Sequence, residues 1–151
     1  METRTGFLIS RIGQVQGRVF QHLLKKSGID AFNGPQGRIL YALWQGDGVP
    51  IVELSRRTGL AKNTLTAMLA RMEEANLIRR TSDAADRRQS RVYLTQQALS
   101  LQADYEAVSQ EMNELFYAGL TQADANVVDG LLDRILENLE KSEKDLKRER
   151  K

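Results

Sequence analysis

The chain of 151 residues contains no cysteine, one histidine and two prolines. The lack of cysteine excludes disulfides, a thiol redox sensor, a cysteine nucleophile and zinc sites built on thiolates. The single histidine, His22, rules out a multi-histidine metal site. The prolines are Pro35 and Pro50, so no later residue is barred from a helix by a missing amide hydrogen.

Long apolar runs and catalytic motifs are also missing. The amino-terminal segment METRTGFLISRIGQVQ has an apolar run of only three residues, so we expect neither a signal peptide nor a membrane span. We therefore expect a cytoplasmic protein. No paired histidine and carboxylate motif, glycine-rich phosphate loop or metal cluster indicates an enzyme, and we expect no cofactor.

Charge is unevenly distributed along the chain, although its formal net value is only +2. Residues 56–91 hold nine Lys and Arg against four Asp and Glu. Residues 1–55 hold six against four, and residues 92–151 hold seven against twelve. A basic middle segment favours contact with a polyanion. The alternative is a solvated surface on which positive charges cluster by chance.

Amphipathic patterns predict helices at both ends of the chain. Apolar residues recur at helical spacing over residues 6–27, and Gly28 suits the end of that helix. Pro35 is typical of the first turn of a second helix. Residues 96–118 repeat the helical pattern, and a further helix begins at Thr121. We expect the charged last eight residues, KDLKRERK, to fray.

Two short helices and a hairpin are predicted between these ends. Residues 51–58 form the first helix, Gly59 supplies a turn, and residues 62–75 form the second helix. Residues 77–81 and 90–95 are short enough to be paired strands. The outer face of the second helix carries small or hydrogen-bonding side chains and one cation: Asn63, Thr64, Thr66, Ala67, Ala70 and Arg71.

The run LSRRTGLAKNTLTAMLARMEEANLIRR from Leu54, followed by DRRQSRVYLT, resembles the MarR family of multiple-antibiotic-resistance regulators. Asp86 and Arg88 with the pair Leu94-Thr95 match the wing signature of that family. The resemblance implies a mainly α fold: a winged helix-turn-helix over residues 49–95, flanked by helices of residues 1–48 and 96–151 that form a dimerisation domain.

The resemblance also implies a function. We expect a sequence-specific regulator of transcription, a homodimeric repressor that binds a pseudo-palindromic site on double-stranded DNA. An architectural winged-helix module with little sequence preference is the alternative. The terminal apolar stripes exceed what one short chain readily covers, which also favours a dimer, although an intramolecular bundle would cover them too.

Two positions depart from the family pattern. Ala61 stands where a serine or proline often opens the recognition helix, and Ala67 stands where many members have arginine. Alanine can contact a thymine methyl group but cannot read guanine with two hydrogen bonds. Base readout would then depend on Asn63, Thr64, Thr66 and Arg71.

The remaining predicted DNA contacts are mostly to phosphate. Lys62, Arg56, Arg57 and Arg79 are expected to bind phosphate and set the register. Arg87 and Arg88 would lie at the hairpin tip, thin enough to reach a minor groove. Asp86 would orient Arg88 or pair with Arg91.

Many relatives release DNA when a small anionic or phenolic compound binds between the dimerisation and DNA-binding domains. An arginine among aromatic side chains suits an aromatic acid as such an effector. The residues predicted to line this pocket are Ile12, Gln16, Val19, Arg38, Tyr41, Trp44 and Tyr105. Ordinary core and rim positions are the alternative for each of them.

Overall fold

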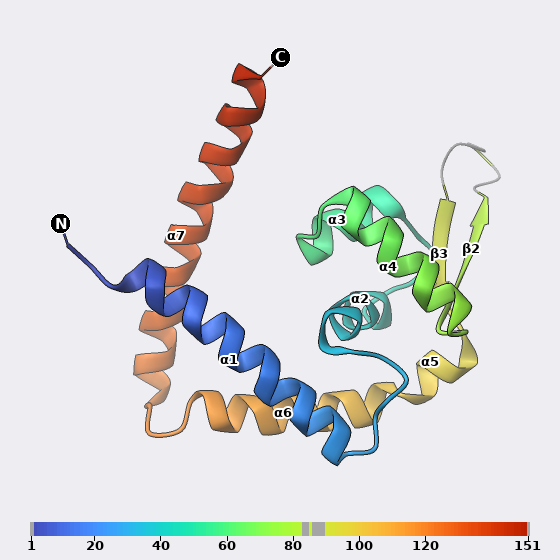
Figure 1. Cartoon of the computed structure of the whole chain (residues 1–151), viewed down its shortest axis with the longest axis horizontal. Coiled ribbons are helices and arrows are strands. Elements are labelled where there is room, and N and C mark those ends of the chain that lie inside the picture. The colour runs from blue at the N-terminus through green and yellow to red at the C-terminus, as the bar shows by residue number, and fades with distance from the viewer. Residues whose placement is uncertain (1, 83–84, 86–89, 151) are drawn as a thin grey trace. The chain divides into compact units, whose positions relative to one another are not determined.

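The computed structural model describes residues 2–82, 85 and 90–150. The chain divides into two compact units, Met1–Met112 and Asn113–Lys151. Figure 1 labels the helices and strands along the chain. The second unit holds the end of α6 and the helix α7 (Gln122–Glu149). The first unit holds the other helices: α1 (Thr5–Lys26), α2 (Gly34–Trp44), α3 (Ile51–Thr58), α4 (Lys62–Glu74), α5 (Gln96–Ser100) and most of α6 (Gln102–Phe116). Within the described ranges, no helix is both long and apolar enough to cross a membrane.

Local capping signals fix the ends of the first two helices. Helix α1 stops at Lys26, and Gly28 follows with a φ of 73°, as its position in the sequence predicts. At the start of α2, the side chain of Asn33 accepts a hydrogen bond from the Gln36 amide at 2.9 Å. Gln36 Oε1 accepts one from the Asn33 amide at 3.1 Å. This reciprocal capping box, with Pro35 in the first turn, starts α2 where expected.

A three-stranded antiparallel sheet carries the predicted hairpin. Strand β2 (Ile78–Ser82) pairs with β3 (Ser90–Leu94), and β1 (Val49–Pro50) pairs with the other edge of β3. The hairpin prediction is confirmed, whereas β1 was not predicted. Gly48 has a φ of 72°, a conformation that glycine adopts readily. Its amide donates to the Val92 carbonyl at 2.8 Å, which places β1 beside β3.

The core lies in the first unit and joins its helices to the sheet. The inner face of α4 contributes Leu65, Leu69 and Met72, which are fully buried. They pack with apolar side chains of the other elements that are also almost fully buried: Leu24, Ile39, Leu40, Leu43, Leu54, Leu77, Ile78 and Val92. Because α3, α4 and the hairpin of β2 and β3 all contribute to this one core, they are held together in a fixed arrangement.

The pattern over residues 96–118 predicted one helix, which is wrong in detail because the helix is broken at Leu101. The Trp44 indole nitrogen donates to the Ala98 carbonyl at 3.0 Å, and the Leu101 amide donates to the same oxygen at 3.2 Å. In a continuous α-helix the Ala98 carbonyl would accept a hydrogen bond from the Gln102 amide. Two helices, α5 and α6, result.

The helix of the second unit begins with the predicted capping box. Thr121 Oγ1 accepts from the Asp124 amide at 3.1 Å, and the Asp124 carboxylate accepts from the Thr121 amide at 2.9 Å. Helix α7 continues to Glu149, so most of the segment that was expected to fray is helical. Lys147 pairs with Glu143 at 3.0 Å, which supports the last turns.

Candidate nucleic-acid interface

A tight turn fixes α4 against α3. Gly59 ends α3 in the left-handed conformation, with a φ of 70°. Ser55 donates its hydroxyl to the Leu60 carbonyl at 2.6 Å. The buried Thr58 hydroxyl donates to the Leu54 carbonyl at 2.8 Å and accepts from the Leu60 amide at 3.3 Å. These bonds satisfy backbone groups that the turn would leave unpaired, so the two helices hold a defined angle.

The face of α4 opposite the core is turned to solvent. Ala61 precedes the helix without a side-chain hydrogen bond to its first turn. In the described part of the chain, the side chains of Asn63, Thr64 and Arg71 take part in no hydrogen bond or ion pair. Ala70 is partly exposed, and the other members of the face are exposed: Lys62, Asn63, Thr64, Thr66, Ala67 and Arg71. The structure therefore places the predicted base-reading residues on one accessible surface.

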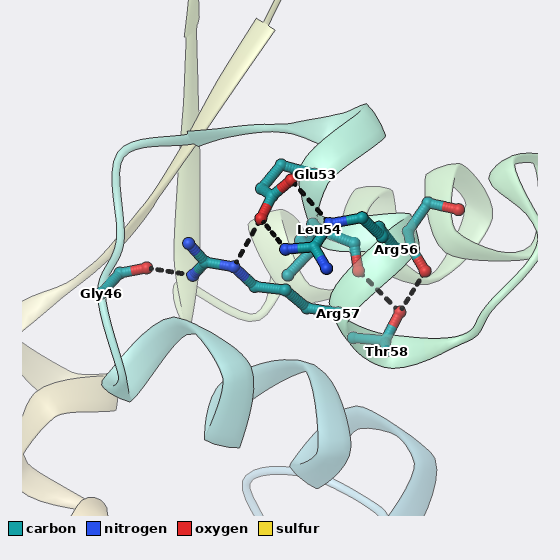
Figure 2. A network of polar contacts seen from close by, with 7 residues as sticks. Gly46, Glu53, Leu54, Arg56, Arg57 and Thr58 are labelled. Carbon is teal, nitrogen blue, oxygen red and sulfur yellow. Dashed lines mark hydrogen bonds and ion pairs between the residues drawn. The ribbon is translucent and has the colours of Figure 1, made fainter.

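Two arginines of α3 share one carboxylate (Figure 2). Arg56 Nη2 lies 2.6 Å from Glu53 Oε1, and Arg57 Nε lies 3.1 Å from the same oxygen. The hydrogen bond from Arg56 and, to a smaller extent, the one from Arg57 lower the pKa of Glu53 to about 2. Glu53 is therefore ionised at neutral pH and holds both guanidinium groups beside α3.

The environments of these two arginines differ. The Arg56 side chain is 72% exposed, so its guanidinium can still meet an outside anion. The Arg57 side chain is 33% exposed, and its Nη1 donates to the Gly46 carbonyl at 3.1 Å. Arg57 therefore ties α3 to the loop that follows α2. Its geometry suits positioning of α3 better than direct phosphate contact.

The arginines of the sheet also have partners within the protein. The Arg79 guanidinium lies over the Tyr93 ring, 5.4 Å from its centroid, and Arg79 is exposed. Arg80 Nη2 pairs with Glu73 Oε1 at 3.0 Å, which helps to lower the pKa of Glu73. Arg91 Nη1 donates to the Gly48 carbonyl at 2.7 Å. These contacts join the hairpin to α4 and to the turn before β1.

Three predicted site residues, Asp86, Arg87 and Arg88, lie outside the described residues. The prediction that Asp86 orients Arg88 or pairs with Arg91 concerns that segment. It stays a prediction.

Sequence reasoning missed two residues that organise this surface. Glu53 lies three and four positions before Arg56 and Arg57, a spacing that could have indicated both ion pairs. The Asp47 carboxylate accepts from the Leu94 amide at 2.9 Å, across 47 positions of sequence. Nothing local in the sequence indicates this second contact.

An aromatic cluster surrounds Tyr105 of α6. Its ring centroid lies 5.1 Å from Trp44, 5.8 Å from Phe20, 5.8 Å from Phe32 and 6.3 Å from Tyr41. Burial raises the pKa of Tyr105. The structure thus brings three of the predicted pocket residues together: Tyr41, Trp44 and Tyr105.

The other predicted pocket residues vary in exposure. Val19 packs against the core and is half-buried, whereas Ile12 and Gln16 are exposed on α1. Arg38 is exposed on α2, and its charge acts on Tyr105 in the direction that lowers the pKa of the phenol.

The pair α3 and α4, the turn at Gly59 and the hairpin of β2 and β3 define a winged helix-turn-helix protein. Residues 32–90 match the model of the MarR family. This match agrees with the resemblance of the sequence to that family.

Relatives resemble the chain in sequence, and solved structures resemble it in fold. The chain is 28% identical over 132 residues to the HTH-type transcriptional repressor IacR of Pseudomonas putida, a match that covers 85% of this chain and 77% of IacR. It is 29% identical over 101 residues to the HTH-type transcriptional regulator TtmR of Methylorubrum extorquens, covering 67% of this chain but only 50% of TtmR. The chain thus spans about half the length of this relative.

A solved structure of BpsR from Bordetella bronchiseptica has the same fold. Its TM-score is 0.78 at 22% identity, and the match covers 88% of this chain and 98% of BpsR. In BpsR, 6-hydroxynicotinic acid regulates DNA binding.

Proposed function

We propose that the protein is a sequence-specific DNA-binding regulator of transcription that acts as a repressor in the cytoplasm. The outward face of α4 carries this proposal. The major groove of DNA admits one α-helix, and short side chains on its outer face can approach base edges. A merely solvated helix favours Glu and Lys, whereas this face presents Asn63, Thr64 and Ala67. The similarity to IacR, a transcriptional repressor, supports repression as the direction of regulation.

The cations around this face would contact phosphate and set the register. Lys62 at the start of α4, Arg56 on α3 and Arg71 on α4 are exposed and suit this role. Arg57 would act through α3, because it already bonds to Glu53 and Gly46. Arg79 and Arg91 would hold the hairpin beside the duplex. From the sequence pattern alone, we also propose the minor-groove contact of Arg87 and Arg88.

We further propose that the protein works as a homodimer, with residues 49–95 contacting DNA and residues 1–48 and 96–151 joining the two copies. Helix α7 has no buried residue and carries an exposed apolar stripe. The stripe includes Val128 (37% exposed), Leu131 (53%), Leu132 (40%), Leu136 (54%) and Leu139 (63%). Helix α1 adds Phe7 at 68% and Ile12 at 47%. Exposed apolar surface of this extent is typical of an interaction face.

Light scattering after size-exclusion chromatography tests the dimer. Leu136→Glu places a charge in the stripe and should yield monomers at micromolar concentration. Lys141→Glu places the same side chain five positions further on, where helical geometry turns it away from the stripe, and should leave a dimer. A wild-type protein that runs as a monomer would instead favour the intramolecular bundle.

We propose an aromatic acid as the effector that releases DNA. The aromatic cluster around Tyr105, with Arg38 as the nearby cation, supports this class of ligand. So does the regulation of BpsR by 6-hydroxynicotinic acid. Arg38→Met keeps the bulk of the side chain but removes its charge. It should weaken the response to such acids while leaving DNA affinity in their absence unchanged.

The proposed function is tested by binding to the intergenic DNA upstream of the protein's own gene. Affinity for this duplex should exceed affinity for unrelated DNA of equal length by roughly a thousandfold at physiological salt. Equal weak binding to both, and to duplexes drawn from a random pool, would favour the architectural alternative.

A further inference from the structure

A small apolar patch lies in the middle of the outward face of α4. Residues three and four apart on a helix are neighbours, so Thr66 and Ala67 both adjoin Ala70. Thr66 and Ala67 are exposed, and Ala70 is partly exposed. We name these three residues the methyl patch. Asn63 lies three positions before Thr66 and four before Ala67, so it borders the methyl patch. Its side-chain amide has no hydrogen-bond partner among the described residues.

The hydroxyl of Thr66 is committed to the helix itself. Thr66 Oγ1 donates to the Lys62 carbonyl at 2.8 Å. A hydroxyl has one hydrogen, so Thr66 cannot donate to a base while this bond stands. The two alanines offer only methyl groups. No member of the patch can therefore supply a hydrogen-bond donor to the groove.

We propose that the methyl patch reads the C5-methyl groups of thymine in the major groove, and that Asn63 reads an adjacent adenine. The inference rests on the proposed function and specifies the sequence class that it recognises. Thymine is the one DNA base with a methyl group in that groove, and small apolar side chains contact it. The amide of asparagine matches the N6 donor and N7 acceptor of adenine.

The same patch disfavours the other bases. Guanine presents two acceptors, N7 and O6, and cytosine presents an amino group. Packed against methyl groups, these polar atoms would lose water without gaining a partner. Glu74, exposed at the end of the same face, would also repel phosphate there. The amino-terminal half of α4 should therefore enter the groove more deeply, with Asn63 and the methyl patch at the bases.

Replacement of thymine by uracil isolates the methyl contact, because uracil keeps the hydrogen-bonding edge and lacks only the methyl group. The full-length protein is first used to select a duplex from a random pool, and the selected duplex is then made with single thymine-to-uracil changes. We expect thymine opposite the patch in each half-site. Each lost contact should weaken binding about fourfold, the equivalent of ~0.8 kcal/mol for one buried carbon. Uracil at uncontacted positions should change nothing.

Two variants of one residue assign the effect to the protein. Thr66→Ser removes the methyl group and keeps the hydroxyl bond to Lys62, so it should lose discrimination between thymine and uracil at one position of each half-site. Thr66→Val keeps methyl groups and removes the hydroxyl, so it should retain that discrimination. Thermal melting of both variants shows whether α4 remains folded.

The outcomes separate this inference from the proposed function. A selection that yields no preferred duplex overturns the proposed function. A preferred duplex that tolerates uracil at every position overturns the methyl readout alone. Discrimination lost in Thr66→Val but kept in Thr66→Ser would overturn the assignment to methyl groups and favour the hydroxyl.

Discussion

Gly37, inside α2, leaves no free space for a larger side chain because the Tyr105 ring occupies it. A Cβ atom at position 37 would lie 2.7 Å from Tyr105 Cε2 and 3.2 Å from Phe32 Cε2. Carbon atoms in favourable contact lie about 3.5–4.0 Å apart, so the ring would have to move by about 1 Å. Tyr105 is only 9% exposed and contacts four other rings, which leaves it little room to move.

Two opposing effects set the magnitude of Gly37→Ala. Alanine stabilises the interior of a helix by about 1 kcal/mol relative to glycine. Overpacking of a core costs about 1–3 kcal/mol. We therefore expect a net loss of about 1 kcal/mol in the free energy of unfolding, where an unobstructed site would give a gain of about 1 kcal/mol.

Urea denaturation of a double-mutant cycle measures the two effects separately. Tyr105→Leu removes the clashing Cε2 atom, because leucine has no atom at that position. In this background Gly37→Ala should be neutral or stabilising. If Gly37→Ala stabilises the protein while Tyr105 is present, the packing account of the aromatic cluster is refuted.

Three further predictions concern the charged groups. The pKa of Glu53 is lowered from its usual 4.5 to about 2, so its contribution to stability is present above about pH 4.5 and is lost as the pH falls through about 2. When the free energy of unfolding is plotted against pH, the curve of Glu53→Gln should therefore fall less steeply over that range than the wild-type curve. Identical curves would contradict the ion pairs of Glu53. Arg56→Ala should weaken DNA binding and lose the stability that its bond to Glu53 supplies. Arg57→Ala should lower the melting temperature more, because it loses the bond to Gly46 as well as one to Glu53, and should weaken DNA binding less. Titrations and thermal melts of both variants test these expectations. Arg88→Ala should reduce the salt dependence of binding by about one cationic contact per protomer, and an unchanged slope would remove Arg88 from the interface.

Much of the fold follows from signals that are local in the sequence. Residues 51–58 form a helix as predicted, because Pro50 and Gly59 bound it on either side. The start of α7 follows from the capping box of Thr121 and Asp124. The left-handed conformation of Asn76, with a φ of 59°, ends α4 as its residue type suggests.

The features that sequence reasoning missed depend on distant contacts. Strand β1 has two residues, one of them proline, and exists because Val49 meets Val92 of β3. The break at Leu101 depends on the indole of Trp44, which bonds to a carbonyl 54 positions away. Neither signal can be read from a local pattern.

In the candidate site, too, local patterns were predictable and contacts between distant parts of the chain were not. Periodicity correctly predicted which residues of α4 face outward, because Leu65, Leu69 and Met72 define the buried face. The different environments of Arg56 and Arg57 could not be predicted, because the Gly46 carbonyl reaches Arg57 only in the folded chain.

Asn63→Ala tests most directly the claim that the outward face of α4 reads DNA sequence. Affinities of the wild type and the variant are compared on a selected duplex and on unrelated DNA of equal length, at the same salt concentration. The variant loses one bidentate base contact in each half-site, ~1–3 kcal/mol apiece, so it should bind the selected duplex at least about thirtyfold more weakly, with unchanged affinity for unrelated DNA. An equal loss on both duplexes, or no loss on either, would contradict readout by this face.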